Sequence, residues 1–372
     1  SVAVVSRGYD LDPCQWKPTY EASRCEAGST VACWSLDAET PWSCWSGSWA
    51  PSWALLDGPS EADAACLALA IPASLSASAS ARGYDGACTL APPSVAAPGH
   101  GALRPAFWQP RPWGEARAKA REVVGRLNAT EKNMLMRGVG WAKTPSFWDL
   151  KKWWYVGGTR PIPRLGIPSL NLQDAAGGFR TYWNELVGTV TAWPSLLCMA
   201  ATWDPGSVRA FAVALGREFA GKGANGILGP SINVHRVARN GRNFEYLSGE
   251  DPYLGSQLVR GYVEGVQSQG IIAVMKHWVF NEQETHRDSE SSEVDEKTKW
   301  ELYYPPFQAA VDAGVDAAMC SYNKVGGTYS CGNEHELKTV LKEKMGFQGF
   351  VQSDWWATHG TWVDRGLDQE MP

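Results

Sequence analysis

Five short apolar segments of the sequence each end in polar side chains whose types are suited to catalysis or binding. The last segment, Gly349 to Asp354, ends in a carboxylate that is followed by Trp355. Chemistry in a parallel α/β protein is placed at the strand ends, so a carboxylate beside an aromatic ring indicates a nucleophile facing a sugar. The alternative is that Asp354 caps a following helix, and this stretch alone does not decide between the two.

The five segment ends form a chemically consistent set. In a barrel of parallel strands, polar residues from different strand ends meet at one site. Two carboxylates, several donors and an aromatic wall predict a pocket for a neutral polyol rather than for a phosphate or a metal ion. The set comprises Asp174, the region from Arg236 to Arg242, Lys276 with His277, Tyr322, and Asp354 with Trp355.

Each member of this set also has a purely structural interpretation. Lys276 and His277 would then be ordinary polar residues at a barrel rim, and Arg242 would be an ion-pair partner of Glu245. Tyr322 would be a core residue whose hydroxyl group is hydrogen-bonded. Their shared position at strand ends favours a site.

Composition and motifs exclude several classes of function. A net charge of -5 and a pI near 5.8 offer no basic face for a nucleic acid. No apolar run approaches the roughly 20 residues that span a bilayer, so we expect no membrane partner. The six histidines lack the spacing of a metal site, so we expect no metal and no cofactor. The G-x-G-x-x-G match at Gly221 to Gly226 ends a helix and opens a strand, which is the wrong context for a dinucleotide.

The elements that must position these residues begin near Arg104. Capping acids before prolines predict helices that begin at Pro205 and Pro252, and residues 127–132 are the expected start of an earlier helix, with Thr130 near its cap. Repeated strand-helix units with apolar strands predict an α/β fold of the (β/α)8 TIM-barrel type, regular or irregular, over residues 105–372. Strands are expected at 169–174, 224–230, 271–277, 315–322 and 349–354, and helices also at 115–127 and 333–345.

Residues 1–104 differ in composition from the rest of the chain, because they are rich in Ser, Ala, Cys, Trp and Pro and show no sustained helical or strand periodicity. We expect an irregular, poorly ordered or non-native extension; a disulfide-stapled aromatic sugar-binding module is the alternative. Six of the nine cysteines lie here and indicate disulfides and an oxidising compartment. Cys320 and Cys331 could also be bridged, which would leave Cys198 unpaired. Together with the sequon at Asn128, the cysteines favour an extracellular or secretory location, although no signal peptide is visible.

Residues from about 127 onward resemble the first, barrel domain of glycoside hydrolase family 3, and are most like its secreted eukaryotic β-glucosidases. The resemblance rests on seven ordered stretches and covers about two thirds of the chain. They are 162–168, 172–180, 241–245, 276–284, 319–323, 346–355 and 366–372, with sequences IPRLGIP, LQDAAGGFR, GRNFE, KHWVFNEQE, MCSYN, GFQGFVQSDW and GLDQEMP.

The resemblance implies hydrolysis of terminal non-reducing β-D-glucosyl residues of a β-glucoside or oligosaccharide, with retention of configuration. Asp354 would be the nucleophile, Asp174 would bind the hydroxyl groups farthest from the scissile bond, and Trp355 would form part of the wall. The subsite of the cleaved sugar would be lined by Arg180, Arg242, Lys276, His277 and Tyr322.

The chain departs from the family pattern at two places. Ala175-Ala176 replaces the usual Gly-Pro beside Asp174, and Met371-Pro372 falls where a second α/β sandwich domain normally follows. That domain supplies the general acid/base in β-glucosidases, so we expect the acid outside this chain, which would be an incomplete fragment that is inactive alone. His286 and Asp288 are the internal candidates for the acid. A β-xylosidase, a β-N-acetylglucosaminidase and an inactive sugar-binding protein are the alternative functions; oligomeric state is not predicted.

Overall fold

The computed structural model describes residues 110–139, 155–174, 177–180 and 188–371, together with the main chain of two short strands near the N-terminus. The chain divides into a unit of residues 19–103 and a unit of residues 1–18 and 104–372. In the first unit, β1 (Val31–Trp34) pairs antiparallel with β2 (Ser43–Ser46). The remaining expectations for residues 1–104, and the loop at Ala175-Ala176, lie outside the described residues.

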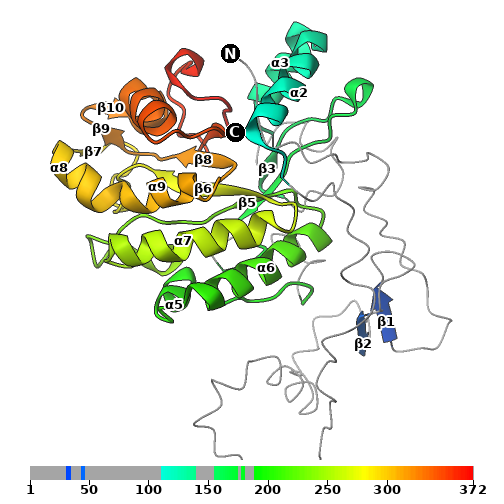
Figure 1. Cartoon of the computed structure of the whole chain (residues 1–372), viewed down its shortest axis with the longest axis horizontal. Helices are drawn as coiled ribbons and strands as arrows, with labels where there is room; N and C mark the ends of the chain where they lie inside the picture. Colours follow the sequence, from blue (N-terminus) through cyan, green and yellow to red (C-terminus); the bar gives the residue numbers. More distant parts are fainter. Residues whose placement is uncertain are drawn as a thin grey trace, which may run out of the picture. The chain divides into compact units, whose positions relative to one another are not determined.

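A six-stranded sheet is the centre of the larger unit (Figure 1). Five of its strands are parallel, and only β3 runs antiparallel to its neighbour β4. The five apolar segments predicted as strands are confirmed. In the order of the sheet, the strands are β11 (Phe350–Ser353), β8 (Ala317–Cys320), β6 (Ile272–Trp278), β5 (Gly226–Leu228), β4 (Asn171–Asp174) and β3 (Gly157–Gly158).

The two edges of this sheet are linked by isolated backbone bridges. Gln352 of β11 pairs with Gln369, the neighbouring Glu370 pairs with Arg137, and Val139 pairs with Gly158 of β3. These segments make single bridges rather than ladders, so they add no regular strands. The α/β, barrel-like fold is therefore present, but the described residues do not establish the complete (β/α)8 barrel, regular or irregular, that was expected from the sequence.

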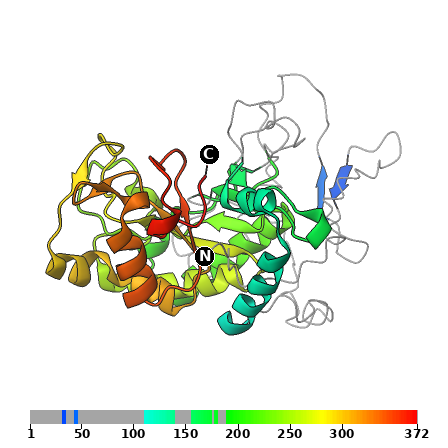
Figure 2. The same ribbon diagram turned by 90° about the horizontal axis from the view of Figure 1, so that it is seen from above.

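The described part of the larger unit also contains helices and three minor strands. Figure 1 shows α6 and α7 side by side below β5 and β6, and Figure 2 shows the same ribbon from above. The helices are α2 (Trp113–Arg126), α3 (Ala129–Met136), α5 (Leu196–Ala200), α6 (Pro205–Gly221), α7 (Pro252–Gln267), α8 (Glu296–Thr298) and α9 (Pro305–Asp312), with π-helices at η6 (Lys299–Tyr303) and η8 (His335–Lys344). Short 3-10 turns are η3 (Pro163–Leu165), η5 (Asn243–Glu245), η7 (Ser330–Gly332) and η9 (Val363–Arg365), and the minor strands are β7 (Ser291–Ser292), β9 (Lys324–Val325) and β10 (Thr328–Tyr329).

The helix starts follow from capping chemistry. The side chains of Asp204 and Asp251 accept hydrogen bonds from the first backbone N–H groups of α6 and α7, as predicted. The helix start predicted within residues 127–132 is confirmed, and its cap is Asn128, two residues before Thr130. Its Oδ1 accepts from the backbone N of Glu131, whose carboxylate accepts in return from the backbone N of Asn128, and this reciprocal pair fixes the earlier start.

Side-chain alternation along the strands produces two separate apolar clusters. On β6, Ile272 and Val274 belong to a cluster on the inner face of the curled sheet, whereas Ala273 and Met275 pack outward against the helices. Successive residues of a strand point to opposite faces of the sheet, so the two-residue period of β6 places its alternate side chains in the two clusters. The inner cluster consists of Val156, Leu172, Leu228, Ile272, Val274, Ala317, Met319, Phe350, Trp355 and Met371.

Three further expectations can be compared with the fold. Cys320 and Cys331 form a disulfide and Cys198 is a free, exposed cysteine, as predicted. Gly221 ends α6 and Gly226 opens β5, so the glycine-rich match does lie between a helix and a strand. Among the described residues, no helix is long and apolar enough to cross a membrane.

Candidate active site

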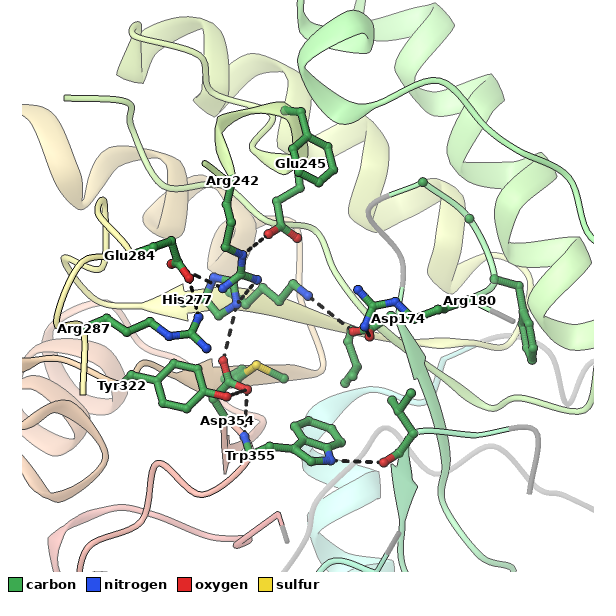
Figure 3. Close-up of a pocket in the computed structure, with 18 of the residues that line it drawn as sticks. Asp174, Arg180, Arg242, Glu245, His277, Glu284, Arg287, Tyr322, Asp354 and Trp355 are labelled. Carbon is green, nitrogen blue, oxygen red and sulfur yellow. Dashed lines mark hydrogen bonds and ion pairs between the residues drawn. The ribbon is translucent and has the colours of Figure 1, made fainter. Parts of the chain in front are cut away.

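A pocket of about 770 Å³ opens at the carboxyl ends of the parallel strands (Figure 3). All eight residues that the sequence assigned to a substrate site line it, whereas Arg236, from the wider predicted region, does not. The eight are Asp174, Arg180, Arg242, Lys276, His277, Tyr322, Asp354 and Trp355.

The strand period explains how these side chains reach the pocket. Leu172 on β4, Val274 on β6 and Phe350 on β11 belong to the inner cluster. Asp174 lies two residues beyond Leu172, Lys276 two beyond Val274, and Asp354 four beyond Phe350, so each shares the inward parity. A shift in the β6–β8 register between Met275 and Trp278 accompanies the departure from alternation that lets His277 line the pocket as well.

The two oxygens of the Asp354 carboxylate have different surroundings. Oδ1 accepts hydrogen bonds from Tyr322 Oη at 2.9 Å and from the backbone N of Trp355 at 2.7 Å. Oδ2 lies 3.5 Å from Nε2 of His277 and accepts no hydrogen bond within the described part of the chain. Residues 355 and 356 form a turn rather than a helix, so the interpretation of Asp354 as a helix cap is wrong.

Burial raises the pKa of Asp354 above its usual value. Opposing this, the positive charges of Arg242 and Lys276 and the hydrogen bonds from Trp355 and Tyr322 favour the ionised form. The carboxylate is therefore held in an apolar setting by a small number of directed donors and cations. Such a group is both more basic than an exposed carboxylate and fixed in orientation.

His277 is a neutral partner of this carboxylate. Burial, followed by the charges of Arg242, Lys276 and Arg287, lowers its pKa well below the usual value. Its Nε2 lies 3.2 Å from Nη2 of Arg242, and its Nδ1 lies 2.9 Å from the hydroxyl of Tyr246. Because a guanidinium group only donates, Nε2 accepts from Arg242 and Nδ1–H donates to Tyr246. The contact between His277 and Asp354 is consequently not an ion pair.

Asp174 lies on the opposite side of the pocket from Tyr322 (Figure 3). Arg180 Nη1 is 2.6 Å from its Oδ2, and Lys276 Nζ is 3.9 Å from its Oδ1. Its carboxylate is partly exposed, whereas the Lys276 side chain is 4% exposed. Carboxylate acceptors and cationic donors at one end of a pocket are suited to hydrogen bonding with vicinal hydroxyl groups.

Arg242 joins the pocket to a second group of charges that the sequence did not single out. It forms an ion pair with Glu245, as the structural interpretation required, and its Nη1 lies 3.6 Å from Glu284. Glu284 in turn binds Arg287 Nη1 at 2.6 Å, and the Arg287 guanidinium stacks 4.0 Å from the centre of the Tyr322 ring. Arg242 is therefore both an ion-pair partner and a pocket residue.

The segment after β6 contributes two pocket residues that the sequence did not single out. Glu284 and Arg287 line the pocket, whereas His286 and Asp288, the candidates for an internal acid, are not among its lining residues. The available signal was their position just beyond a strand end, inside or next to the 276–284 motif.

Trp355 forms a wall by lying against the main chain of the sheet edge. Its indole Nε1 donates to the backbone oxygen of Val156 at 3.1 Å, and a Cβ on Gly157 would meet the ring at 2.5 Å. Phe244 and Trp356 also line the pocket and are 51% and 64% exposed. These rings provide apolar faces next to the polar floor, as carbohydrate pockets require.

The donor set of the pocket does not resemble a metal site. Within the described residues, no group of three or more His, Cys, Asp or Glu side chains is arranged to hold a metal ion. The arrangement combines one oriented, buried carboxylate with hydroxyl-binding polar groups. It is suited to nucleophilic attack by Asp354 on a bound neutral substrate.

Residues 159–370 match the family model described as the glycosyl hydrolase family 3 N terminal domain. A beta-glucosidase of Rhizobium radiobacter is 47% identical over 256 residues, which cover 68% of this chain and 29% of that protein. Beta-glucosidase cel3A of Pyricularia oryzae is 39% identical over 264 residues, which cover 70% and 34%. The chain thus spans about a third of the length of these curated relatives.

Solved structures also match more than two thirds of this chain. A beta-D-glucoside glucohydrolase from Trichoderma reesei matches with a TM-score of 0.64 and 39% identity, over 70% of this chain and 35% of that one. Beta-glucosidase 3B from Thermotoga neapolitana, solved in complex with alpha-D-glucose, matches with a TM-score of 0.63 and 36% identity, over 68% and 36%.

Proposed function

The chain belongs to glycosyl hydrolase family 3, and we propose that it forms the part of a retaining β-glucosidase that binds the terminal glucosyl unit and supplies the nucleophile. The observation that carries this proposal is the Asp354 carboxylate. It lies at a strand end in the pocket, with Oδ1 held by two donors and Oδ2 without a hydrogen bond among the described residues.

In the first step, Oδ2 of Asp354 attacks the anomeric carbon of the glucosyl unit. The bond between that carbon and the glycosidic oxygen breaks, and the leaving oxygen takes a proton from a general acid. A glycosyl ester of Asp354 and a free alcohol result. Tyr322 and the backbone N of Trp355 keep the attacking carboxylate in line by holding Oδ1.

In the second step, a water molecule attacks the anomeric carbon from the face that the alcohol has left. The ester bond breaks, Asp354 regains its carboxylate, and the former acid takes the proton of the water. The product is glucose with the configuration of the substrate. Two inversions at one carbon account for the retention.

Sugar binding is assigned to the rest of the pocket. Asp174, with Arg180 and Lys276 beside it, binds the hydroxyl groups farthest from the scissile bond. Arg242, His277 and Trp355 line the subsite of the cleaved sugar. Neutral His277 adds no positive charge to the cationic environment of the nucleophile.

We assign the general acid to a group outside the described residues. The other carboxylates that line the pocket, Asp174, Glu245 and Glu284, each make an ion pair with an arginine and serve as acceptors there. The much greater length of the curated relatives supports a second contribution from beyond this region.

Two further assignments rest on the same family. We assign an irregular (β/α)8 barrel to the natural domain, supported by the bridges that link the edges of the sheet. We also assign an extracellular or secretory location, supported by the Cys320–Cys331 disulfide, because such bonds persist in oxidising compartments.

The nucleophile can be tested by covalent labelling in the natural full-length protein. A 2-deoxy-2-fluoro-β-glucoside with a good leaving group needs little acid assistance, so it should form a stable ester on Asp354 that peptide mass spectrometry locates. Asp354→Asn should abolish labelling. A folded wild-type sample that stays unlabelled, or is labelled elsewhere, would overturn the assignment.

Substrate class is tested separately with a panel of aryl β-glycosides. Faster turnover of the glucoside than of the xyloside and the N-acetylglucosaminide supports the proposal. Calorimetric binding of glucose without turnover of any glycoside would instead indicate an inactive sugar-binding protein.

A further inference from the structure

Behind the pocket lies a buried acidic residue that the proposed mechanism does not use. Glu282 is 2% exposed and does not line the pocket. Its Oε1 accepts a hydrogen bond from Nδ2 of Asn233 at 2.9 Å, and its Oε2 lies 3.3 Å from Nε of Arg236. Burial of a carboxylate costs free energy unless hydrogen bonds and opposite charges offset it, so the partners of Glu282 indicate what it contributes.

Asn233 connects Glu282 to the main chain of His277. Besides its bond to Glu282, Nδ2 of Asn233 donates to the backbone oxygen of His277 at 3.0 Å, and Oδ1 accepts from the backbone N of His277 at 2.6 Å. One amide side chain therefore holds both backbone polar groups of a pocket residue. This occurs where the register between β6 and β8 is interrupted.

The orientation of the Asn233 amide depends on its acidic neighbour. An ionised carboxylate only accepts hydrogen bonds, so it requires the NH₂ end of Asn233 to face it. The oxygen of Asn233 is then directed at the N–H of His277, as the contact requires. With the opposite orientation, two N–H groups would face each other.

We propose that Glu282 and Asn233 are positioning residues of the pocket, which set the main chain of His277 and through it the imidazole beside Asp354. The proposal rests on the proposed function. The His277 ring lies 3.5 Å from Oδ2 of Asp354 and binds Arg242 and Tyr246. A displaced backbone moves the ring with respect to all three groups, and misplacement of about 1 Å can cost roughly 100-fold in rate.

The electrostatic surroundings of Glu282 make the positioning of His277 by Glu282 and Asn233 sensitive to pH. Burial raises the pKa of Glu282 to about 7, with Glu290 adding to the effect, while Asn233 and Arg236 oppose it. In addition to burial, the charge of Glu282 raises the pKa of Tyr246 and of Tyr303. Ionisation near neutral pH thus strengthens the hold on the NH₂ end of Asn233.

The test is a double-mutant cycle in the natural full-length protein, with an aryl β-glucoside as substrate. Glu282→Ala and Asn233→Ala should each lower kcat by about 10- to 100-fold, because each releases the same backbone. The double variant should lose little beyond the worse single variant, within about threefold, since the two act in series. Losses that multiply, or an unchanged kcat, would overturn the proposal.

The matched control is Glu336→Gln, which alters another buried carboxylate, paired with Lys299 and Tyr304 and absent from the pocket lining. It should leave kcat unchanged in the fraction that folds.

Should the alanine variants fail to fold, Asn233→Asp keeps the shape and removes only the NH₂ donor. Its kcat should fall with rising pH as the new carboxyl group and Glu282 both ionise and repel each other. A profile parallel to that of the wild type would count against the proposal.

Failure of the proposed function is recognised separately. If the wild type turns over no glycoside but binds glucose by calorimetry, the same cycle is read from the glucose affinity. Weakened, non-additive binding would still support the positioning role, and additive or unchanged binding would refute it.

Discussion

Tyr322, just beyond the end of β8, donates a hydrogen bond of 2.9 Å to Oδ1 of Asp354, just beyond the end of β11. The two strands are neighbours in the sheet. Arg287 stacks over the same tyrosine ring, so the hydroxyl is held from a third segment. The carboxylate proposed as nucleophile is thereby oriented by side chains that lie far apart in the sequence.

Tyr322→Phe should lower kcat/KM by about 10- to 100-fold, the usual worth of a hydrogen bond to a charged group. The hydroxyl lowers the pKa of Asp354, so its removal should raise that pKa further and shift the acid limb of the pH–rate profile to higher pH. Kinetics across the acid range measure both effects. Tyr262→Phe is the control, because this buried core hydroxyl has no hydrogen-bond partner within the described residues; an equal loss there would argue against the specific contact.

Gly157→Ala should displace the indole of Trp355. The added Cβ would come within 2.5 Å of the ring, and the expected loss is about 1–3 kcal/mol of unfolding free energy together with a raised KM. Chemical denaturation and steady-state kinetics measure the two effects. In contrast, Gly125→Ala on α2 meets no atom within 4 Å and should stabilise by up to about 1 kcal/mol. An unchanged KM in Gly157→Ala would show that the wall does not depend on this contact.

Glu282→Gln should remove a pH-dependent contribution to stability. The pKa of Glu282 is about 7 in the folded protein against an ordinary value of 4.5, so between these values the folded state binds more protons than the unfolded state. Its contribution is therefore present below the lower value and is lost as pH rises through the higher one, by up to about 3 kcal/mol. Denaturation curves at pH 5 and pH 8 should diverge between wild type and variant, and parallel behaviour would contradict the assignment.

Reduction of the Cys320–Cys331 disulfide, or its replacement by two serines, should cost about 3 kcal/mol, as expected for a loop of this length. Because the loop contains Tyr322, kcat should fall as well. Thermal melting with and without reductant measures the first effect. Cys198→Ser, at an exposed free cysteine, should change neither quantity.

Much of the fold could be predicted because it follows from local chemistry. The aspartates before Pro205 and Pro252 cap their helices with their own side chains, and the buried runs such as Ile272–Trp278 have too few polar residues to form surface loops. The start of α3 was predicted only to within residues 127–132, because Asn128 and Thr130 are both capping residue types, and the reciprocal bonds between Asn128 and Glu131 identify Asn128 as the cap.

By itself, the sequence determined the apolar parallel strands, the position of Asp174, Lys276 and Asp354 at strand ends, and the family resemblance. These depend on short apolar runs and on short ordered motifs. Only the tertiary structure decided which oxygen of Asp354 is held by donors, that Glu284 and Arg287 rather than His286 and Asp288 line the pocket, and that Glu282 reaches His277 through Asn233. The physical reason is that the contacts made by Tyr322 and Asn233 join residues 32 to 49 positions apart in the chain, so their geometry depends on how the strands pack side by side rather than on any local pattern.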